Sequence, residues 1–291
     1  MLTQLLLQVV VAVSILLSVG LAGVVGRDRL SLLREEWKSR LRTSAPAIAL
    51  LLAILLLNRI MRQQGRSLSQ EYGVHMTEVF YTIEGEFVLH FQKIASPEAN
   101  AYFSMSYVYG YVFLLIFPVI AYAARSKTID FRRLLIAYSL NYAIGLVFYI
   151  LFIAYGPRNV FVEELTQTML YDNNPQVQYL TTEVNRNTNV FPSLHTSLSA
   201  TVATFAYQTR STYPRWFPIA VCLSISIMIS TMYLGIHWGI DVLAGLALAG
   251  FCVSLSTYLV DRWSLTAIFE QVRERVHEYR DTVTTPSQEN S

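Results

Sequence analysis

Long runs of apolar residues, separated by short polar or charged stretches, extend over most of the 291-residue chain. A helix needs about 20 consecutive apolar residues to cross the hydrocarbon layer of a bilayer. Windows near that length occur at residues 2–25, 44–60, 101–124, 134–155, 192–207, 217–234 and 239–260. The pattern predicts an all-α integral membrane protein, a polytopic helical bundle with about seven spans.

Two regions fall outside these windows. Between residues 62 and 100, apolar residues such as Phe80, Ile83 and Phe87 recur at roughly helical spacing among charged ones. This pattern predicts an amphipathic helix that lies at the membrane interface. The tail, 261–291, begins as a charged helix and ends in a polar stretch that cannot bury a core, so we expect its end to be disordered.

Composition excludes an ordinary soluble enzyme. Hydrophobic residues make up 53% of the chain, charged residues 14%, and the mean hydropathy is +0.39. The first window has no basic residues before it and is too long for a signal peptide, so we expect it to remain as a membrane anchor. Cys222 and Cys252 fall within predicted spans, where they are expected to pack as small apolar residues. The sequence has no zinc-binding pattern.

Lys and Arg residues are unequally shared between the two sides of the predicted bundle. Short loops rich in these residues remain cytoplasmic. The connections after the first, third and fifth windows, together with the tail, hold 16 of the 22 Lys and Arg residues. We therefore expect the N-terminus outside and the C-terminus in the cytoplasm, most simply in the cell membrane. The connection 156–190 and the window ends near residues 192 and 237 then face away from the cytoplasm.

Candidate chemistry is concentrated in two short stretches at the ends of apolar windows. Residues 191–195 read Phe-Pro-Ser-Leu-His, and residues 233–241 read Tyr-Leu-Gly-Ile-His-Trp-Gly-Ile-Asp. On a helix, an imidazole four residues before a carboxylate faces it, so Asp241 is expected to fix the tautomer of His237 and raise its basicity. Such a pair suits a nucleophile.

Structural interpretations of the same residues exist. Ser193, after Pro192, could simply cap a helix, and His237 with Asp241 could form a satisfied pair between helices. Ionisable residues within or beside spans are costly and are therefore functional candidates. Because His195, His237 and Asp241 are expected on one membrane face, their combination favours a functional site.

The two stretches resemble the second and third signatures of the type 2 phosphatidic acid phosphatase superfamily, in particular of its inositol phosphorylceramide synthase-like branch. Gly156-Pro157-Arg158 is similar to the shortened first signature of that branch. The resemblance covers roughly residues 134–260. It implies N-terminal spans at 1–124, including the outward segment 62–100, a phosphatase-like catalytic core at 125–260, and a cytoplasmic tail at 261–291.

The resemblance also implies a mechanism. His237 would be the nucleophile that takes the phosphoryl group as a phosphohistidine, Asp241 would orient it, and His195 would be the general acid for the leaving oxygen. No metal and no cofactor is required by this scheme.

Phosphate contacts are implied for Arg158, Ser193 and Thr231. An arginine can hold phosphate oxygens with a bidentate fork, and Ser193 can offer its hydroxyl beside helix N-terminal amides. The wider family has a Lys where this chain has Leu151 and an Arg where it has Thr231. A phosphomonoester dianion needs more positive charge than a diester monoanion, so the two losses favour a diester or headgroup-transfer substrate. Alternatively, another cation replaces the lost charge: Arg186, Lys93 or Arg66.

We therefore expect a membrane-embedded lipid phosphatase or phosphotransferase. A lipid headgroup would enter the site while its chains stay among the membrane lipids, and either water or an alcohol acceptor such as inositol or a lipid hydroxyl would complete the reaction. The sequence leaves hydrolysis and transfer open, and no nucleic acid is expected as a partner. A polytopic transporter is an alternative for which Asn141, inside a span, is the main feature. A non-catalytic lipid-binding relative is another.

Overall fold

The computed structural model describes residues 2–161, 165, 189–262 and 275. Its first half contains α1 (Leu2–Gly20), the π-helical turn η1 (Leu21–Val25), α2 (Arg27–Tyr72), β1 (Val74–His75), α3 (Thr77–Glu84), the 3-10 helix η2 (Phe87–Ile94), α4 (Pro97–Met105), the π-helical turn η3 (Ser106–Gly110) and α5 (Tyr111–Ala123). The second half contains α6 (Ile129–Leu151), β2 (Phe152–Ile153), the 3-10 turn η4 (Pro157–Asn159), α9 (Leu194–Gln208), α10 (Trp216–Tyr233) and α11 (Gly239–Arg262). The chain is an all-α polytopic membrane protein, as the hydrophobic pattern predicts.

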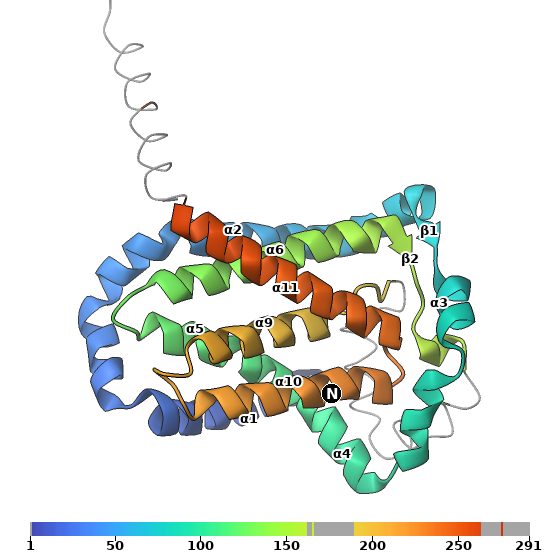
Figure 1. Cartoon of the computed structure of the whole chain (residues 1–291), viewed down its shortest axis with the longest axis horizontal. Coiled ribbons are helices and arrows are strands. Elements are labelled where there is room, and N and C mark those ends of the chain that lie inside the picture. The colour runs from blue at the N-terminus through green and yellow to red at the C-terminus, as the bar shows by residue number, and fades with distance from the viewer. Residues whose placement is uncertain (1, 162–164, 166–188, 263–274, 276–291) are drawn as a thin grey trace, which may run out of the picture.

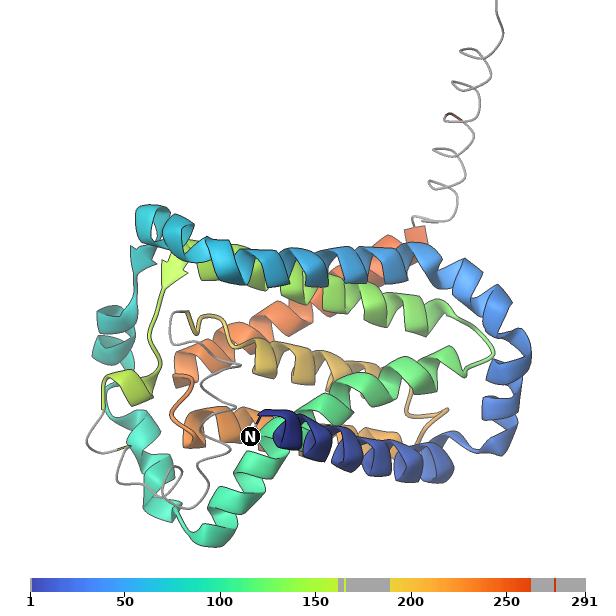
Figure 2. The same ribbon diagram turned by 180° about the vertical axis from the view of Figure 1, so that it is seen from behind.

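Six helical segments in the described residues are long and apolar enough to cross a membrane: Leu6–Val25, Arg27–Met61, Pro97–Ala123, Ile129–Leu151, Trp216–Tyr233 and Gly239–Arg262. The expected fifth span, residues 192–207, corresponds to α9, which has only 15 residues. A helix rises about 1.5 Å per residue, so α9 falls short of the hydrocarbon thickness. It lies inside the bundle in Figures 1 and 2.

The short helix α9 forms the centre of the bundle and contacts α5, α6, α10 and α11. Its buried face is built from small and hydroxyl-bearing residues, which let helix backbones approach closely. Asn141 of α6 donates to Thr201 Oγ1 at 3.2 Å and accepts from the Ser197 hydroxyl. Its amide therefore joins α6 to α9, and this contact accounts for a polar residue inside a predicted span.

Segment 77–94 does not form the single amphipathic helix expected from its apolar spacing. Gly85 has a φ of 56° and ends α3, because left-handed backbone at this point stops the helix. The chain continues as η2. Phe80 of α3 and Val88 of η2 are buried in one apolar cluster with Trp238. The segment thus packs as two short helices against the turn before α11.

The two ends of the bundle collect different connections (Figures 1 and 2). The α5–α6 and α9–α10 connections and the end of α11 lie at the left in Figure 1, where the first part of α2 also crosses the bundle. The strands β1 and β2, which pair in parallel, lie at the other end with α3 and the start of α11. The helices therefore bring the basic connections together at one end and the histidine stretches together at the other.

Candidate active site

A tight turn between α10 and α11 carries His237. Gly235 adopts a φ of 64°, which favours glycine. The backbone N–H groups of Ile236 and His237 both donate to the carbonyl oxygen of Thr231, at 3.0 and 3.1 Å. The expectation that His237 and Asp241 lie on the same helix is therefore wrong. His237 precedes the helix, and only Asp241 belongs to α11.

The turn nevertheless brings His237 to Asp241. The distance between His237 Nδ1 and Asp241 Oδ2 is 3.4 Å, which is long for a hydrogen bond. The same carboxylate oxygen accepts the backbone N–H of Trp238 at 2.9 Å, as a residue in the first helical turn does in a capping box. The side chain of Asp241 is fully buried, and its Oδ1 atom has no hydrogen-bond partner. Asp241 therefore ties the start of α11 to the imidazole.

The protonation of His237 differs from the sequence-based expectation. Burial, and secondly the positive charge of Arg158, lower its pKa from 6.5 to about 3, although a hydrogen bond with the Val190 backbone acts in the opposite direction. The expected rise in basicity from Asp241 is thus wrong for this state of the protein, because desolvation outweighs the long contact with the carboxylate. His237 is consequently neutral near pH 7, the form that can attack an electrophile.

Residues 191–195, at the start of α9, also lie beside the start of α11. Ser193 Oγ accepts the N–H of Thr196 at 3.3 Å, so Ser193 is the N-cap of α9, as the structural alternative for this residue expects. Its own N–H donates to the backbone carbonyl of Asp241 at 3.1 Å. A Cβ atom on Gly245 would lie 2.6 Å from the Ser193 carbonyl oxygen, so α11 and the start of α9 are in close contact.

His195 lies in the first turn of α9 and contacts two tyrosine rings. Its ring centroid is 4.6 Å from that of Tyr107 and 4.3 Å from that of Tyr111. The centroids of His195 and His237 are 6.4 Å apart. This distance is short enough for both imidazoles to reach one phosphoryl group, each across a contact of about 3 Å. The tyrosine contacts restrict the orientation of the His195 ring.

The third stretch, Gly156-Pro157-Arg158, packs directly on the His237 turn. The N–H of Arg158 donates to the carbonyl oxygen of Gly235 at 2.9 Å. A Cβ atom on Gly156 would lie 2.2 Å from the carbonyl oxygen of Ile236, so only glycine permits this approach. The guanidinium is near enough to lower the pKa of His237. All three stretches therefore converge on one turn.

Thr231 supports this turn mainly through its backbone. Its hydroxyl donates to the Met228 carbonyl at 2.7 Å, so a bond from this hydroxyl to phosphate would require it to leave that acceptor. Of the cations that could replace the missing family charges, Lys93 is exposed. The side chain of Arg66 and the whole of Arg186 lie outside the described parts of the structure. The phosphate contacts expected of Arg158, Ser193 and Thr231 remain predictions.

Glu84, Tyr107 and Tyr111 were not identified as site residues from the sequence. The Glu84 carboxylate, at the end of α3, accepts the N–H groups of Gly239 and Ile240 at 2.8 and 3.0 Å. It thereby holds the N-terminus of α11, where a negative charge is favourable. The amphipathic pattern of segment 62–100 was the only signal that this segment belongs to the site. Within the described residues, no group of three His, Cys, Asp or Glu side chains is placed to hold a metal ion.

Comparison with known proteins supports one assignment. The model of the PAP2 superfamily, which is the type 2 phosphatidic acid phosphatase superfamily, matches residues 80–255. The match begins within α3 and includes Glu84, both tyrosines that contact His195, and all three converging stretches. No curated protein and no solved structure matches the chain.

Proposed function

The chain belongs to the PAP2 superfamily, and we propose that it is a lipid phosphatase or phosphotransferase that works through a phosphohistidine on His237. Membership suggests a phosphatase-type activity on lipid phosphates. The observation that carries the mechanism is the convergence on the His237 turn, with two imidazole centroids 6.4 Å apart and a buried carboxylate beside one of them.

In the first step, a nitrogen of neutral His237 attacks phosphorus while the bond between phosphorus and the leaving oxygen breaks. Protonated His195 gives its proton to that oxygen, which leaves as an alcohol. Asp241 orients His237 and stabilises the positive charge that develops on its ring. In the second step, water or an alcohol attacks the phosphohistidine, His195 takes back the proton, and His237 is released.

We favour a phosphodiester or headgroup-transfer substrate. Arg158 adjoins His237, whereas Leu151 and Thr231 occupy the positions of two cations in the wider family. Glu84 adds negative charge at the start of α11, because its carboxylate accepts the N–H of Gly239. Gly239 is only two residues beyond His237. An environment of this charge disfavours a dianion more than a monoanion. Whether the chain belongs to the inositol phosphorylceramide synthase-like branch depends on the acceptor: water would make it a phosphatase, and an alcohol such as inositol or a lipid hydroxyl would make it a transferase.

The same end of the bundle receives the headgroup from the non-cytoplasmic side in this proposal. The distribution of Lys and Arg residues supports an external N-terminus, a cytoplasmic C-terminus and a place in the cell membrane. Cysteine accessibility to a membrane-impermeant reagent tests this orientation. A cysteine introduced at exposed His90, near the site, should react in intact cells, and one introduced at exposed Lys127, at the opposite end, should not.

The decisive experiment measures phosphate release and transfer of radiolabelled headgroup from a panel of lipid phosphomonoesters and phosphodiesters. His237→Ala and His195→Ala should each abolish the reaction that the wild type performs, and His237→Ala should also remove an acid-labile phosphoprotein. His75→Ala serves as the matched control, because His75 is exposed in β1. A wild type without turnover on any substrate would support a non-catalytic lipid-binding relative. Full activity in both active-site variants would exclude the mechanism.

A further inference from the structure

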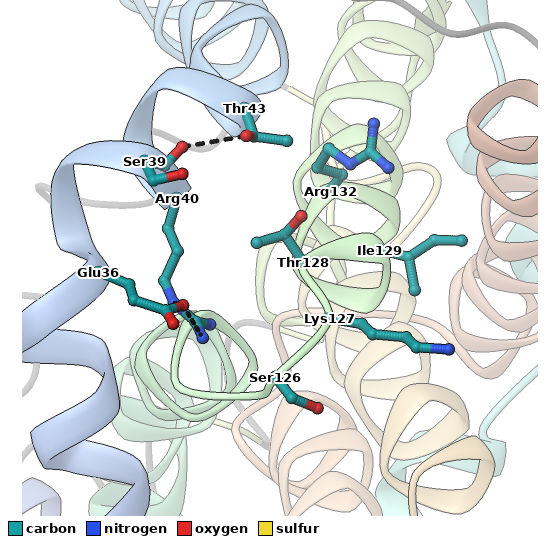
Figure 3. A pocket seen from close by; sticks show the side chains of 9 residues that line it. All are labelled: Glu36, Ser39, Arg40, Thr43, Ser126, Lys127, Thr128, Ile129 and Arg132. Carbon is teal, nitrogen blue, oxygen red and sulfur yellow. Dashed lines mark hydrogen bonds and ion pairs between the residues drawn. The ribbon is translucent and has the colours of Figure 1, made fainter.

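A pocket of about 410 Å³ lies at the end of the bundle opposite the candidate active site. Figure 3 shows side chains of α2 along one side of it and those of residues 126–129 and Arg132 along the other. Its volume falls in the range of small-molecule sites, about 300–1,000 Å³. None of the residues that line it takes part in the proposed reaction.

The lining of the pocket has an excess of positive charge. The lining contains three basic residues, Arg40, Lys127 and Arg132, and a single carboxylate, that of Glu36. Glu36 is already paired with Arg40, whose Nε and Nη2 lie 3.2 and 2.9 Å from its Oε2 atom. Arg40 also donates to the carbonyl oxygen of Ala123 at 2.9 Å, so it serves as a structural clamp. Within the described residues, no carboxylate forms an ion pair with Lys127 or Arg132, so their charges remain for a ligand.

A nearby carboxylate does not cancel this charge. Asp130 follows the lining residue Ile129 but is engaged by two other arginines. Arg125 forms a hydrogen-bonded ion pair with Asp130 Oδ2, and Arg133 Nη1 lies 3.6 Å from Oδ1. Neither Arg125 nor Arg133 lines the pocket. The local balance thus stays positive.

Two further features leave donors without acceptors at the pocket. The Nε atom of Arg132 is buried and has no hydrogen-bond partner, which costs free energy unless a ligand supplies an acceptor. The helix α6 starts beside the pocket at Thr128, whose side chain does not cap it. A helix N-terminus without a side-chain cap presents N–H groups to an anion. An anion with several acceptor oxygens would satisfy both features.

We propose that this pocket binds a phosphate group, either that of an anionic lipid headgroup or free phosphate from solution. Arg132 forms a charge-assisted bond with the phosphate oxygens, and Lys127 adds a second charge. On α2, Trp37 and Leu41 directly follow the lining residues Glu36 and Arg40 in the sequence and are 51% and 48% exposed, so a lipid could approach from this helix. Such side chains are favourable at the boundary between headgroups and hydrocarbon.

The test titrates full-length protein in a neutral detergent with dioctanoyl phosphatidylglycerol, with inorganic phosphate, and with dioctanoylglycerol, which lacks phosphate. All proteins carry His237→Ala, so that no probe is consumed. Lys127→Gln with Arg132→Gln should weaken binding of the phosphate probe about tenfold or more. The matched control, Arg34→Gln with Arg42→Gln, removes the same charge from exposed positions of α2 outside the pocket and should change binding by less than about twofold.

The probes separate the two sources. Binding of phosphatidylglycerol without binding of inorganic phosphate identifies a lipid headgroup, and binding of both identifies the phosphate group alone as sufficient. Equal affinity of the parent and the Lys127/Arg132 variant, or binding of neither phosphate probe, would overturn the proposal. Thermal unfolding checks the variants independently. The phosphate probe should raise the unfolding temperature of the parent and of the control by more than that of the pocket variant, which keeps only the phosphate contacts of the candidate active site.

Discussion

The two ends of the bundle hold polar groups of opposite character. At the candidate active site the central groups are two imidazoles and one buried carboxylate, and Glu84 holds the amides at the start of α11. At the opposite end the pocket contains guanidinium and ammonium groups, and the start of α6 has no side-chain cap. One end thus supplies groups that exchange protons and form bonds, whereas the other supplies permanent charges.

In our two proposals, this difference separates catalysis from binding. A neutral imidazole can be a nucleophile, and a histidine can give and recover a proton near neutral pH. Arginine stays protonated and lysine does so when exposed, so such groups hold an anion without converting it. Substitutions at the His237 end should therefore change turnover. Those at the pocket should change affinity for a phosphate group while the reaction continues.

The largest effect is expected from Asp241→Asn. The amide retains the size of the side chain but removes the charge that would stabilise the His237 ring after attack, so kcat should fall by about 10²–10⁴-fold. Initial rates on the best lipid substrate measure the effect. Asp28→Asn, an exposed position at the start of α2, is the matched control and should leave kcat unchanged. A loss of less than about twofold in Asp241→Asn would restrict Asp241 to a structural role.

Gly156→Ala tests whether the three stretches must touch. The added methyl group would meet the Ile236 carbonyl 2.2 Å away and force Arg158 and the His237 turn apart. Misplacing reacting groups by about 1 Å can cost about 10²-fold in rate, and we expect a loss of that order together with a lower unfolding temperature. Gly250→Ala, within α11, meets no atom within 4 Å and should keep activity and slightly raise stability. Equal activity of the two variants would contradict the close approach.

Much of the fold was predictable from the sequence because spans and short motifs are local signals. The apolar runs located all six of the described helical segments that are long enough to cross a membrane. The order of these runs also predicted that the motif residues lie at one end of the bundle. His195, His237, Asp241 and Arg158 were found because each belongs to a contiguous motif. The length of α9 was overestimated, since its small and hydroxyl-bearing residues suit a buried helix as well as a span.

Contacts between distant segments were not predictable. Glu84 and Gly239 are 155 residues apart, and neither position has a pattern that indicates the other. The tyrosines beside His195 looked like ordinary aromatic residues of a span. The pKa of His237 was also missed, because burial depends on the whole packed site and not on the spacing to Asp241. Sequence reasoning therefore located the candidate site residues better than it predicted their environment.

The pH dependence of stability tests the buried state of His237. Its pKa is lowered to about 3 in the folded protein, so between that value and about 6.5 the unfolded chain binds more protons. The contribution of His237 is thus complete above pH 6.5 and is lost as pH falls, by up to about 1.4 kcal/mol per pH unit. Unfolding temperatures from pH 4 to 8 should fall less steeply for His237→Gln than for the wild type. An identical pH dependence in both would show that His237 is not buried, and His90→Gln, at an exposed position, is the control.

The smallest effect is expected from Glu84→Gln. This variant tests whether the negative charge at the His237 end of the bundle influences the choice of substrate. The amide still accepts one backbone N–H, so loss of the negative charge should lower stability by only about 0.5–1 kcal/mol. Removing this charge near His237 should favour dianionic substrates, and the ratio of kcat/KM for a phosphomonoester to that for a phosphodiester should rise about two- to fivefold. Glu78→Gln, exposed on the same helix, should not alter the ratio. If Glu84→Gln also leaves the ratio unchanged, Glu84 only holds the start of α11, and the proposed preference for diesters would rest on the missing cations alone.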